Sequence, residues 1–273
     1  MTGDKENKAA RLLPEMPAPE RDRMNALPYW FPKIEKPAKN AGLKVPKTIW
    51  ADIPVPVQRA FYMEGPDDMA TITAFVDRTV RPAIRDAGLG LVFLKNGSYS
   101  HKFDARSACL PVMSDLPHAV MSIMYEAMLR CGFQYDGTDV LVMRERIGHD
   151  PRNTPCIYNG LPFRPEYRVF YDFDAKRRIF TAEYWDKDYV YGKLYDLTDK
   201  LVFDAWYDRI HGEYLSNKAR VENLVETAMA GVSGLSGPWS VDVMQDENGD
   251  FWLIDMAVAE MSAYWDRRPE AAR

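Results

Sequence analysis

The chain has 273 residues, of which 47% are hydrophobic and 12% aromatic, so it can bury a substantial core and is too apolar to be disordered. Its formal net charge of −5 argues against a protein that binds nucleic acid through a broad basic face. No apolar run approaches the roughly 20 residues of a membrane span, and the three cysteines form neither a disulfide framework nor a zinc motif. We therefore expect a cytoplasmic protein without membrane partners.

The N-terminal part of the chain predicts a tail followed by folded segments. Residues 1–23 predict a flexible tail, because three prolines interrupt any helix there. The segment 27–42 predicts a short apolar helix or turn, and 47–53 predicts a strand between two prolines. A longer helix over 67–87 follows, with acidic residues in its first turn and apolar residues at helical spacing.

The next strand, LVFL, ends at Lys95 and runs into a small polar loop over 96–102. This loop contains Ser98, Ser100 and Lys102, and its small residues allow backbone N–H groups to approach anionic oxygens. The spacing is not that of a Walker phosphate loop, so a hairpin turn with two surface lysines is the alternative. The Lys-Asn-Gly string is also similar to the lysine motif of nucleotidyl-transferring ligases.

The middle of the chain predicts a helix over 115–130 and a strand over 139–147. The methionines of that helix indicate a core face, and His118 near its start has no partner at metal-ligand spacing. The strand leaves the core through Arg144 and Glu145. Such a charged exit either lines a cleft, where backbone groups can bind a base edge, or forms a surface ion-pair cluster.

Residues 166–185 predict a hairpin with strict alternation. Glu166 and Arg168 lie on one face, and aromatic and β-branched side chains lie on the other. An unpaired guanidinium is disfavoured inside a strand, so Arg168 needs a carboxylate or phosphate partner. A structural partner such as Glu166 or Glu183 is the alternative to a ligand.

The stretch 186–200 predicts a tyrosine-rich loop, and 201–232 predicts a helix that breaks near Gly212. A last hairpin lies within 239–265. The succession of strands, helices and hairpins indicates an α+β fold with antiparallel sheets.

The last hairpin carries one acidic residue in each hydrophobic strand, Asp242 in SVDVM and Asp255 in FWLIDM. A buried carboxylate is costly unless it is paired or metal-bound, and two on adjacent strands can converge on one cation. Simple alternation places Asp255 on the same face as Leu253 and Ala257. The Asn-Gly pair between the strands predicts a tight turn. The alternative is two carboxylates on a solvated face.

In this order, the strand lysine, the small-residue loop, the MRERI exit, the EYRVF strand and the SVDVM/FWLIDM hairpin resemble an ATP-grasp protein. The resemblance spans residues 90–265. It is nearest to uncharacterised bacterial and phage ATP-grasp proteins, and more distant to the eukaryotic ATP-grasp chaperone that assembles a translation initiation factor. It implies two α+β lobes over 89–273 whose antiparallel sheets hold ATP and Mg²⁺, preceded by a segment over 24–88.

The resemblance also implies roles for single residues. Lys95 would contact the α-phosphate and Arg168 the γ-phosphate, so these two are the catalytic candidates. The rest of the nucleotide would lie against Ser98, Ser100, Lys102, Arg144, Glu145 and Ile147. Mg²⁺ would be held by Asp242, Asp255 and Glu260. Many relatives carry Asn where this chain has Ala257, and Glu260 replaces it only if the chain turns after Asp255.

The implied activity is ATP- and Mg²⁺-dependent ligation, in which a carboxylate takes the γ-phosphoryl group and an amine then displaces phosphate. An ATP-binding chaperone or assembly factor without turnover is the second possibility. A nucleotidyl transferase that uses Lys95 as its nucleophile is the third. The sequence does not identify the acceptor, which is a small molecule, a peptide or a protein.

Overall fold

The computed structural model describes the residues 23–62, 65, 67–100, 102, 105–111, 115–130, 139–148 and 152–270. The predicted tail over 1–23 lies outside this part of the chain except for Arg23. Within it, no helix combines the length and apolarity that a membrane span requires. Cys109 and Cys156 are free thiols, and Cys131 lies outside the described residues.

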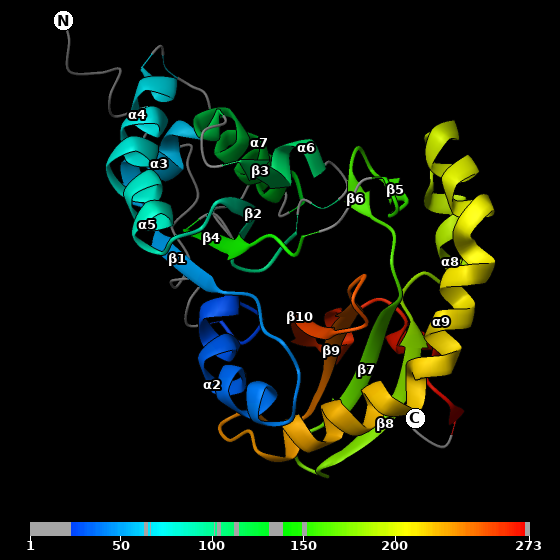
Figure 1. Ribbon diagram of the computed structural model, residues 1–273. Helices are drawn as coiled ribbons and strands as arrows, with labels where there is room; N and C mark the ends of the chain where they lie inside the picture. Colours follow the sequence, from blue (N-terminus) through cyan, green and yellow to red (C-terminus); the bar gives the residue numbers. More distant parts are fainter. Residues whose placement is uncertain are drawn as a thin grey trace, which may run out of the picture.

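Two four-stranded antiparallel sheets form the framework and lie in separate halves of the molecule (Figure 1). The first has the order β1-β4-β2-β3, and the second has the order β10-β9-β7-β8. The strands of the first sheet are β1 (Thr48–Asp52), β2 (Leu91–Asn96), β3 (Cys109–Pro111) and β4 (Val140–Glu145). Those of the second are β7 (Glu166–Asp172), β8 (Arg177–Glu183), β9 (Pro238–Gln245) and β10 (Phe251–Val258). The predicted α+β fold with antiparallel sheets is confirmed.

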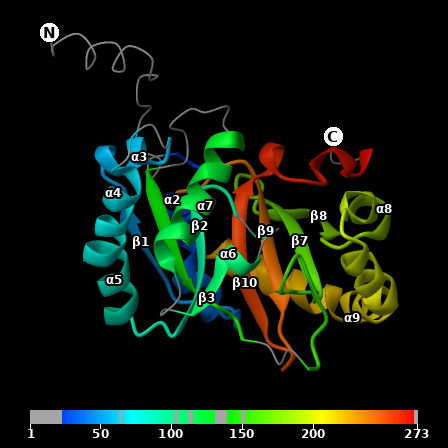
Figure 2. The same ribbon diagram turned by 90° about the horizontal axis from the view of Figure 1, so that it is seen from above.

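Helices flank each sheet, as the two ribbon views show (Figures 1 and 2). Those near the first sheet are α3 (Val55–Ala60), α4 (Asp68–Phe75), the π-helical η2 (Val76–Val80), α5 (Arg81–Asp86), α6 (Ala105–Ala108) and α7 (Leu116–Arg130). Those near the second are α2 (Leu27–Asn40), α8 (Lys187–Val190), α9 (Leu197–Ala230) and the 3₁₀ turns η3 (Tyr191–Lys193), η4 (Ala259–Met261) and η5 (Trp265–Arg267). The predicted helix over 67–87 corresponds to α4, η2 and α5 in succession. A short hairpin, β5 (Cys156–Ile157) and β6 (Leu161–Pro162), lies between the halves in the sequence.

The alternation predicted for β7 holds and places one face of the second sheet in a core. Tyr167, Val169 and Tyr171 pack into a cluster that also contains Val221 and Val225 of α9. The other face of β7 carries Glu166 and Arg168, which lie outside this core and face the first sheet. Period-two alternation therefore sends the apolar side chains to α9 and α2, and the charged ones between the sheets.

Two segments fold differently from the predictions. Helix α9 is continuous over 34 residues, and the predicted break at Gly212 is wrong because helix-forming neighbours on both sides outweigh one glycine. The predicted loop over 186–200 contains α8 and η3 instead. The carboxylate of Asp186 caps α8 by accepting a hydrogen bond from the Tyr189 backbone N–H at 3.0 Å.

The predicted tight turn lies within the five residues that connect β9 and β10, where the Gly249 N–H donates to the Asp246 carbonyl at 3.1 Å. The carboxylate of Asp246 organises this loop by accepting hydrogen bonds from the backbone N–H groups of Asn248 and Asp250, each at 2.9 Å. Gly249 has a φ of 80°, which a glycine adopts without strain.

Candidate functional site

A cavity of about 320 Å³ lies between the two sheets, and ten of the eleven predicted site residues line it. The ten come from β2, β4, β7, β9, β10 and the segments after β2 and β4: Lys95, Ser98, Ser100, Lys102, Arg144, Glu145, Ile147, Arg168, Asp242 and Asp255. The first sheet, the second sheet and the polar loop after Lys95 thus meet at one place. We call this space the inter-sheet cavity.

A β-bulge at Ile254 places Asp255 in the inter-sheet cavity. Leu253 pairs with Val243 and Asp255 pairs with Asp242, so Ile254 is an extra residue in β10. Leu253 is therefore buried in the core of the second sheet, whereas Asp255 lines the cavity. The prediction that Leu253 and Asp255 share a face was wrong, because the bulge interrupts the alternation between them.

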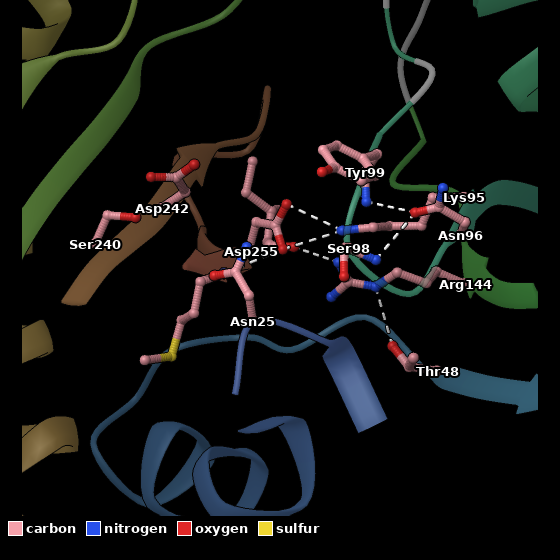
Figure 3. Close-up of polar contacts among 12 residues, drawn as sticks. Asn25, Thr48, Lys95, Asn96, Ser98, Tyr99, Arg144, Ser240, Asp242 and Asp255 are labelled. Atoms are coloured by element: carbon pink, nitrogen blue, oxygen red, sulfur yellow. Dashed lines mark hydrogen bonds and ion pairs between the residues drawn. The ribbon is translucent and has the colours of Figure 1, made fainter. Parts of the chain in front are cut away.

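Lys95 and Asp255 join the two sheets by an ion pair across the cavity (Figure 3). The Lys95 Nζ atom lies 3.2 and 3.1 Å from the two carboxylate oxygens, and its side chain is only 2% exposed. Burial acts to raise the pKa of Asp255, but the positive charges of Lys95 and Arg144 outweigh it and lower that pKa below its ordinary value. Asp255 is therefore ionised at neutral pH.

Arg168 and Asp242 form a second ion pair, directly opposite each other on β7 and β9. The guanidinium is bidentate, with Nε 2.8 Å and Nη2 2.6 Å from the two carboxylate oxygens. Its central carbon also lies 4.8 Å from the centre of the Tyr184 ring. Burial acts against the charge, but Asp242 outweighs it and raises the pKa of Arg168. The predicted structural partners Glu166 and Glu183 do not fill this role.

Arg144 is anchored on both sheets and still has unused hydrogen-bonding capacity. Its Nε donates to the Thr48 hydroxyl at 3.1 Å, and its Nη1 donates to the carbonyl of the bulge residue Ile254. Nη2 is buried and has no hydrogen-bond partner among the described residues. Burial, only partly opposed by Asp255, lowers the pKa of Arg144 to about 10. An incoming anion would satisfy this group.

Two further cavity residues, Arg164 and Glu166, were not among the predicted site residues. Arg164 is 4% exposed and donates from Nη2 to the Gly148 carbonyl at 2.9 Å, while its Nε and Nη1 are buried without a described partner. Glu166 is 5% exposed, its Oε2 has no described partner, and burial raises its pKa. Glu166 could have been predicted as a site residue, because it lies two residues before Arg168 and so on the same face of the strand. Arg164 lies in a loop without periodicity, and nothing in the sequence points to it.

The inter-sheet cavity is positive although the chain as a whole is negative. Of the described residues, six that line it are basic: Lys95, Lys102, Arg144, Arg146, Arg164 and Arg168. Four of the described lining residues are acidic: Glu145, Glu166, Asp242 and Asp255. Because several of these cations are buried, their field is weakly screened by solvent. With unpartnered N–H groups on two of its arginines, the lining suits an anion with several oxygens.

The acidic residues fit a metal ion only in part. Asp242 and Asp255 are opposite each other in register and both line the cavity, but each already binds a cation of the chain. The chain does turn after β10, in η4, yet Glu260 is exposed and does not line the cavity. Among the described residues, no group of three or more His, Cys, Asp or Glu lies close enough to hold a metal. Two carboxylates suit Mg²⁺ where phosphate oxygens complete its shell.

No family model matches the chain, and no curated protein matches it in sequence. The structure is similar to Cdc123 from Schizosaccharomyces pombe, with a TM-score of 0.50 and 14% identity over 92% of both chains. It is also similar to the VanG D-Ala:D-Ser ligase from Enterococcus faecalis (TM-score 0.41, 13% identity), covering 82% of this chain and 50% of the ligase. A RimK domain ATP-grasp protein from Sphaerobacter thermophilus gives a TM-score of 0.36 at 10% identity, covering 88% of this chain and 60% of that one. The chain thus shares its overall fold with Cdc123.

Proposed function

We propose that the protein binds ATP with Mg²⁺ in the inter-sheet cavity. The observation that carries this proposal is the convergence of six basic side chains from both sheets on one cavity, in a chain of net charge −5. Buried guanidinium groups with unpartnered N–H atoms are costly, and phosphate oxygens are their preferred bidentate acceptors. The resemblance of the sequence to ATP-grasp proteins supports the choice of a nucleotide over other anions.

The cavity lining divides into groups with different tasks. Lys95 and Arg144 on the first sheet would bind phosphate oxygens from one side, and Arg164 and Arg168 from the other. The loop with Ser98, Ser100 and Lys102 would cover the phosphates, and Glu145 and Ile147 would meet adenine and ribose. When bound, ATP supplies a transferable γ-phosphoryl group, and Mg²⁺ between Asp242 and Asp255 would neutralise its charge.

The reaction that we propose is ligation of a carboxylate to an amine, with Arg168 and Lys95 stabilising charge at the phosphates. It predicts release of ADP and phosphate that requires an added carboxylate and amine. The buried setting of these cations would hold the phosphates away from bulk water, which favours transfer to a bound acceptor over hydrolysis.

A second candidate is an ATP-binding assembly factor that does not turn ATP over. Two observations favour it: Ala257 has no side-chain oxygen to offer a metal, and both aspartates are paired with basic side chains of the chain itself. The likeness to Cdc123 also extends over 92% of both chains. We do not propose a nucleotidyl transferase, because the Lys95 ammonium is paired with Asp255 and so is not a free nucleophile.

Calorimetric titration with ATP and MgCl₂ tests the shared part of both candidates. We expect binding by the wild type, and loss of at least about tenfold in affinity in Lys95→Met and in Lys102→Met, since a charge-assisted contact contributes about 1.5–3 kcal/mol. Lys39→Met, an exposed change on α2, is the matched control. Absence of ATP binding by the wild type would reject the proposal. ADP release with and without acceptors then separates the ligase from the assembly factor.

A further inference from the structure

A second cavity, of about 630 Å³, lies beside the first and shares Tyr184 and Ala263 with it. Half of the described residues that line it are aromatic: Tyr158, Tyr184, Trp185, Tyr189, Tyr195 and Tyr264. We call it the aromatic pocket. It lies at the α8–α9 side of the second sheet and is built largely from the segment 184–199, which takes no part in the nucleotide assignments above.

The walls of the aromatic pocket are held in place. The Tyr264 hydroxyl donates to the Tyr184 carbonyl at 2.6 Å, and the Tyr189 and Tyr264 rings lie 4.2 Å apart. Among the described residues, four that are not glycine have a positive φ, and three of these line the pocket: Tyr158, Asn159 and Tyr264. Such backbone strain persists only where surrounding contacts enforce it, and it concentrates at binding sites.

Tyr184 forms a common wall between the two cavities. On the side of the inter-sheet cavity, Lys102 lies 3.8 Å and Arg168 lies 4.8 Å from the centre of its ring. These are the cations that we assign to the phosphates. A group bound in the aromatic pocket therefore lies next to the phosphate end of the inter-sheet cavity.

The charge of the aromatic pocket is opposite to that of the inter-sheet cavity. Of the described residues that line it, Asp196 and Asp199 are acidic and Lys193 is basic. Its rings also accept cations, because Lys193 Nζ lies 3.3 Å from the centre of the Tyr189 ring and the Arg267 guanidinium lies 4.9 Å from it. Lys193 is exposed, so a cation from outside can replace it.

The rim indicates that the ligand is larger than a free amine. Tyr195, which lines the pocket, is 93% exposed, and Leu197 and Leu201 in the first turns of α9, which follow it in sequence, are 72% and 63% exposed. Several large exposed apolar side chains in one segment are typical of a surface that a macromolecule covers. A peptide with a basic side chain would place that side chain among the rings and its neighbours on this rim.

We infer that the aromatic pocket binds a lysine- or arginine-bearing segment of a peptide or protein. This ligand would be the acceptor of the ligase or the partner of the assembly factor, so the inference rests on the proposed function. In the free protein the Lys193 ammonium contacts the Tyr189 ring, where it competes with the basic side chain of the ligand. Asp199, whose Oδ1 accepts from the Tyr158 backbone N–H at 3.0 Å, supplies the opposing charge.

Titration with tetralysine, tetraserine and tetraglutamate tests this inference. We expect tetralysine to bind and the other two peptides not to bind. Lys193→Ala should tighten tetralysine binding about threefold, because it removes a competing cation–π contact. Asp199→Asn, which keeps the acceptor for Tyr158, should weaken it about tenfold.

The controls carry the same charge changes at neighbouring positions outside the pocket. Lys187→Ala and Asp188→Asn on α8 should leave tetralysine affinity close to that of the wild type. Equal binding of the three peptides, or equal effects of Lys193→Ala and Lys187→Ala, would overturn the inference. ATP is titrated in parallel on the wild type. Failure of ATP alone rejects the proposed function, and failure of tetralysine alone rejects the basic ligand.

Discussion

Glu166 is a buried carboxyl group whose ionisation opposes folding. Burial raises its pKa above the ordinary value of 4.5, so the folded chain binds this proton more tightly than the unfolded chain. The protonated Glu166 therefore stabilises the fold, and this contribution is complete below pH 4.5. It is lost as the pH rises through the folded-state pKa. We expect Glu166→Gln to raise the free energy of unfolding at pH 7 by about 1 kcal/mol and to have little effect near pH 4. Urea unfolding at both pH values measures this, with exposed Glu260→Gln as a control.

The pKa of Asp255 is shifted in the opposite direction to that of Glu166. The pKa of Asp255 is lowered below the ordinary value of 3.8, so its contribution to stability is present above that pH and is lost as the pH falls through the lower, folded-state pKa. Asp255→Asn leaves Lys95 buried without its partner. Allowing for the 34% exposure of Asp255, we expect a loss of about 2 kcal/mol at pH 7. Urea unfolding should show a smaller difference from the wild type at pH 2.5, and an unchanged difference would contradict the ion-pair explanation.

At the scale of single elements, the bulge in β10 makes an unusual deletion tolerable. The partners of Leu253 and Asp255 in β9 are consecutive, so removal of Ile254 leaves both side chains on their present faces. We expect the Ile254 deletion to fold with a loss of about 1–2 kcal/mol, chiefly because Arg144 loses a carbonyl acceptor. Deletion of Met256, in the regular part of the strand, should prevent folding because it reverses the faces beyond it. Circular dichroism and urea unfolding distinguish the two.

Helix α9 contains a glycine that its geometry does not need. A Cβ atom at Gly212 would meet no atom within 4 Å, and its φ is not positive. We expect Gly212→Ala to stabilise the protein by about 0.5–1 kcal/mol, because alanine has less backbone freedom to lose. Gly42→Ala is the contrast, since a φ of 93° is strained for alanine and should lower the melting temperature. Thermal unfolding of both variants checks this.

The sequence was sufficient to predict most strands and to bring together ten residues that line one cavity, but not to predict how the strands pair in detail. Alternation identified the faces of β7 because each residue there has one partner in β9. The same rule failed for Leu253 and Asp255, since a bulge has no signature in hydrophobic pattern. Arg164 could not be found because its burial depends on Gly148 and Glu247, which lie far from it in sequence.

At the scale of the whole molecule, the distribution of charge should control binding. A chain of net charge −5 repels ATP at a distance, whereas the inter-sheet cavity attracts it. We expect the affinity for ATP to fall by about an order of magnitude between about 0.05 and 0.5 M NaCl, because salt screens the cations of the cavity. Adenosine lacks phosphates and should show little dependence on salt in the same titration. A similar salt dependence for both would mean that the phosphates do not lie among these cations.

The two ion pairs that line the inter-sheet cavity, Lys95–Asp255 and Arg168–Asp242, have a thermodynamic consequence for the order in which its ligands arrive. Lys95 and Arg168 can bind an anion only if their ion pairs with Asp255 and Asp242 are broken or weakened. The two carboxylates can bind a metal ion only if the same ion pairs are broken or weakened. Binding of either ligand therefore lowers the free-energy cost of breaking these ion pairs for the other ligand. By thermodynamic reciprocity the coupling is equal in both directions. Within these two pairs each charge neutralises its partner, and the metal and the phosphates should therefore bind with positive heterotropic cooperativity.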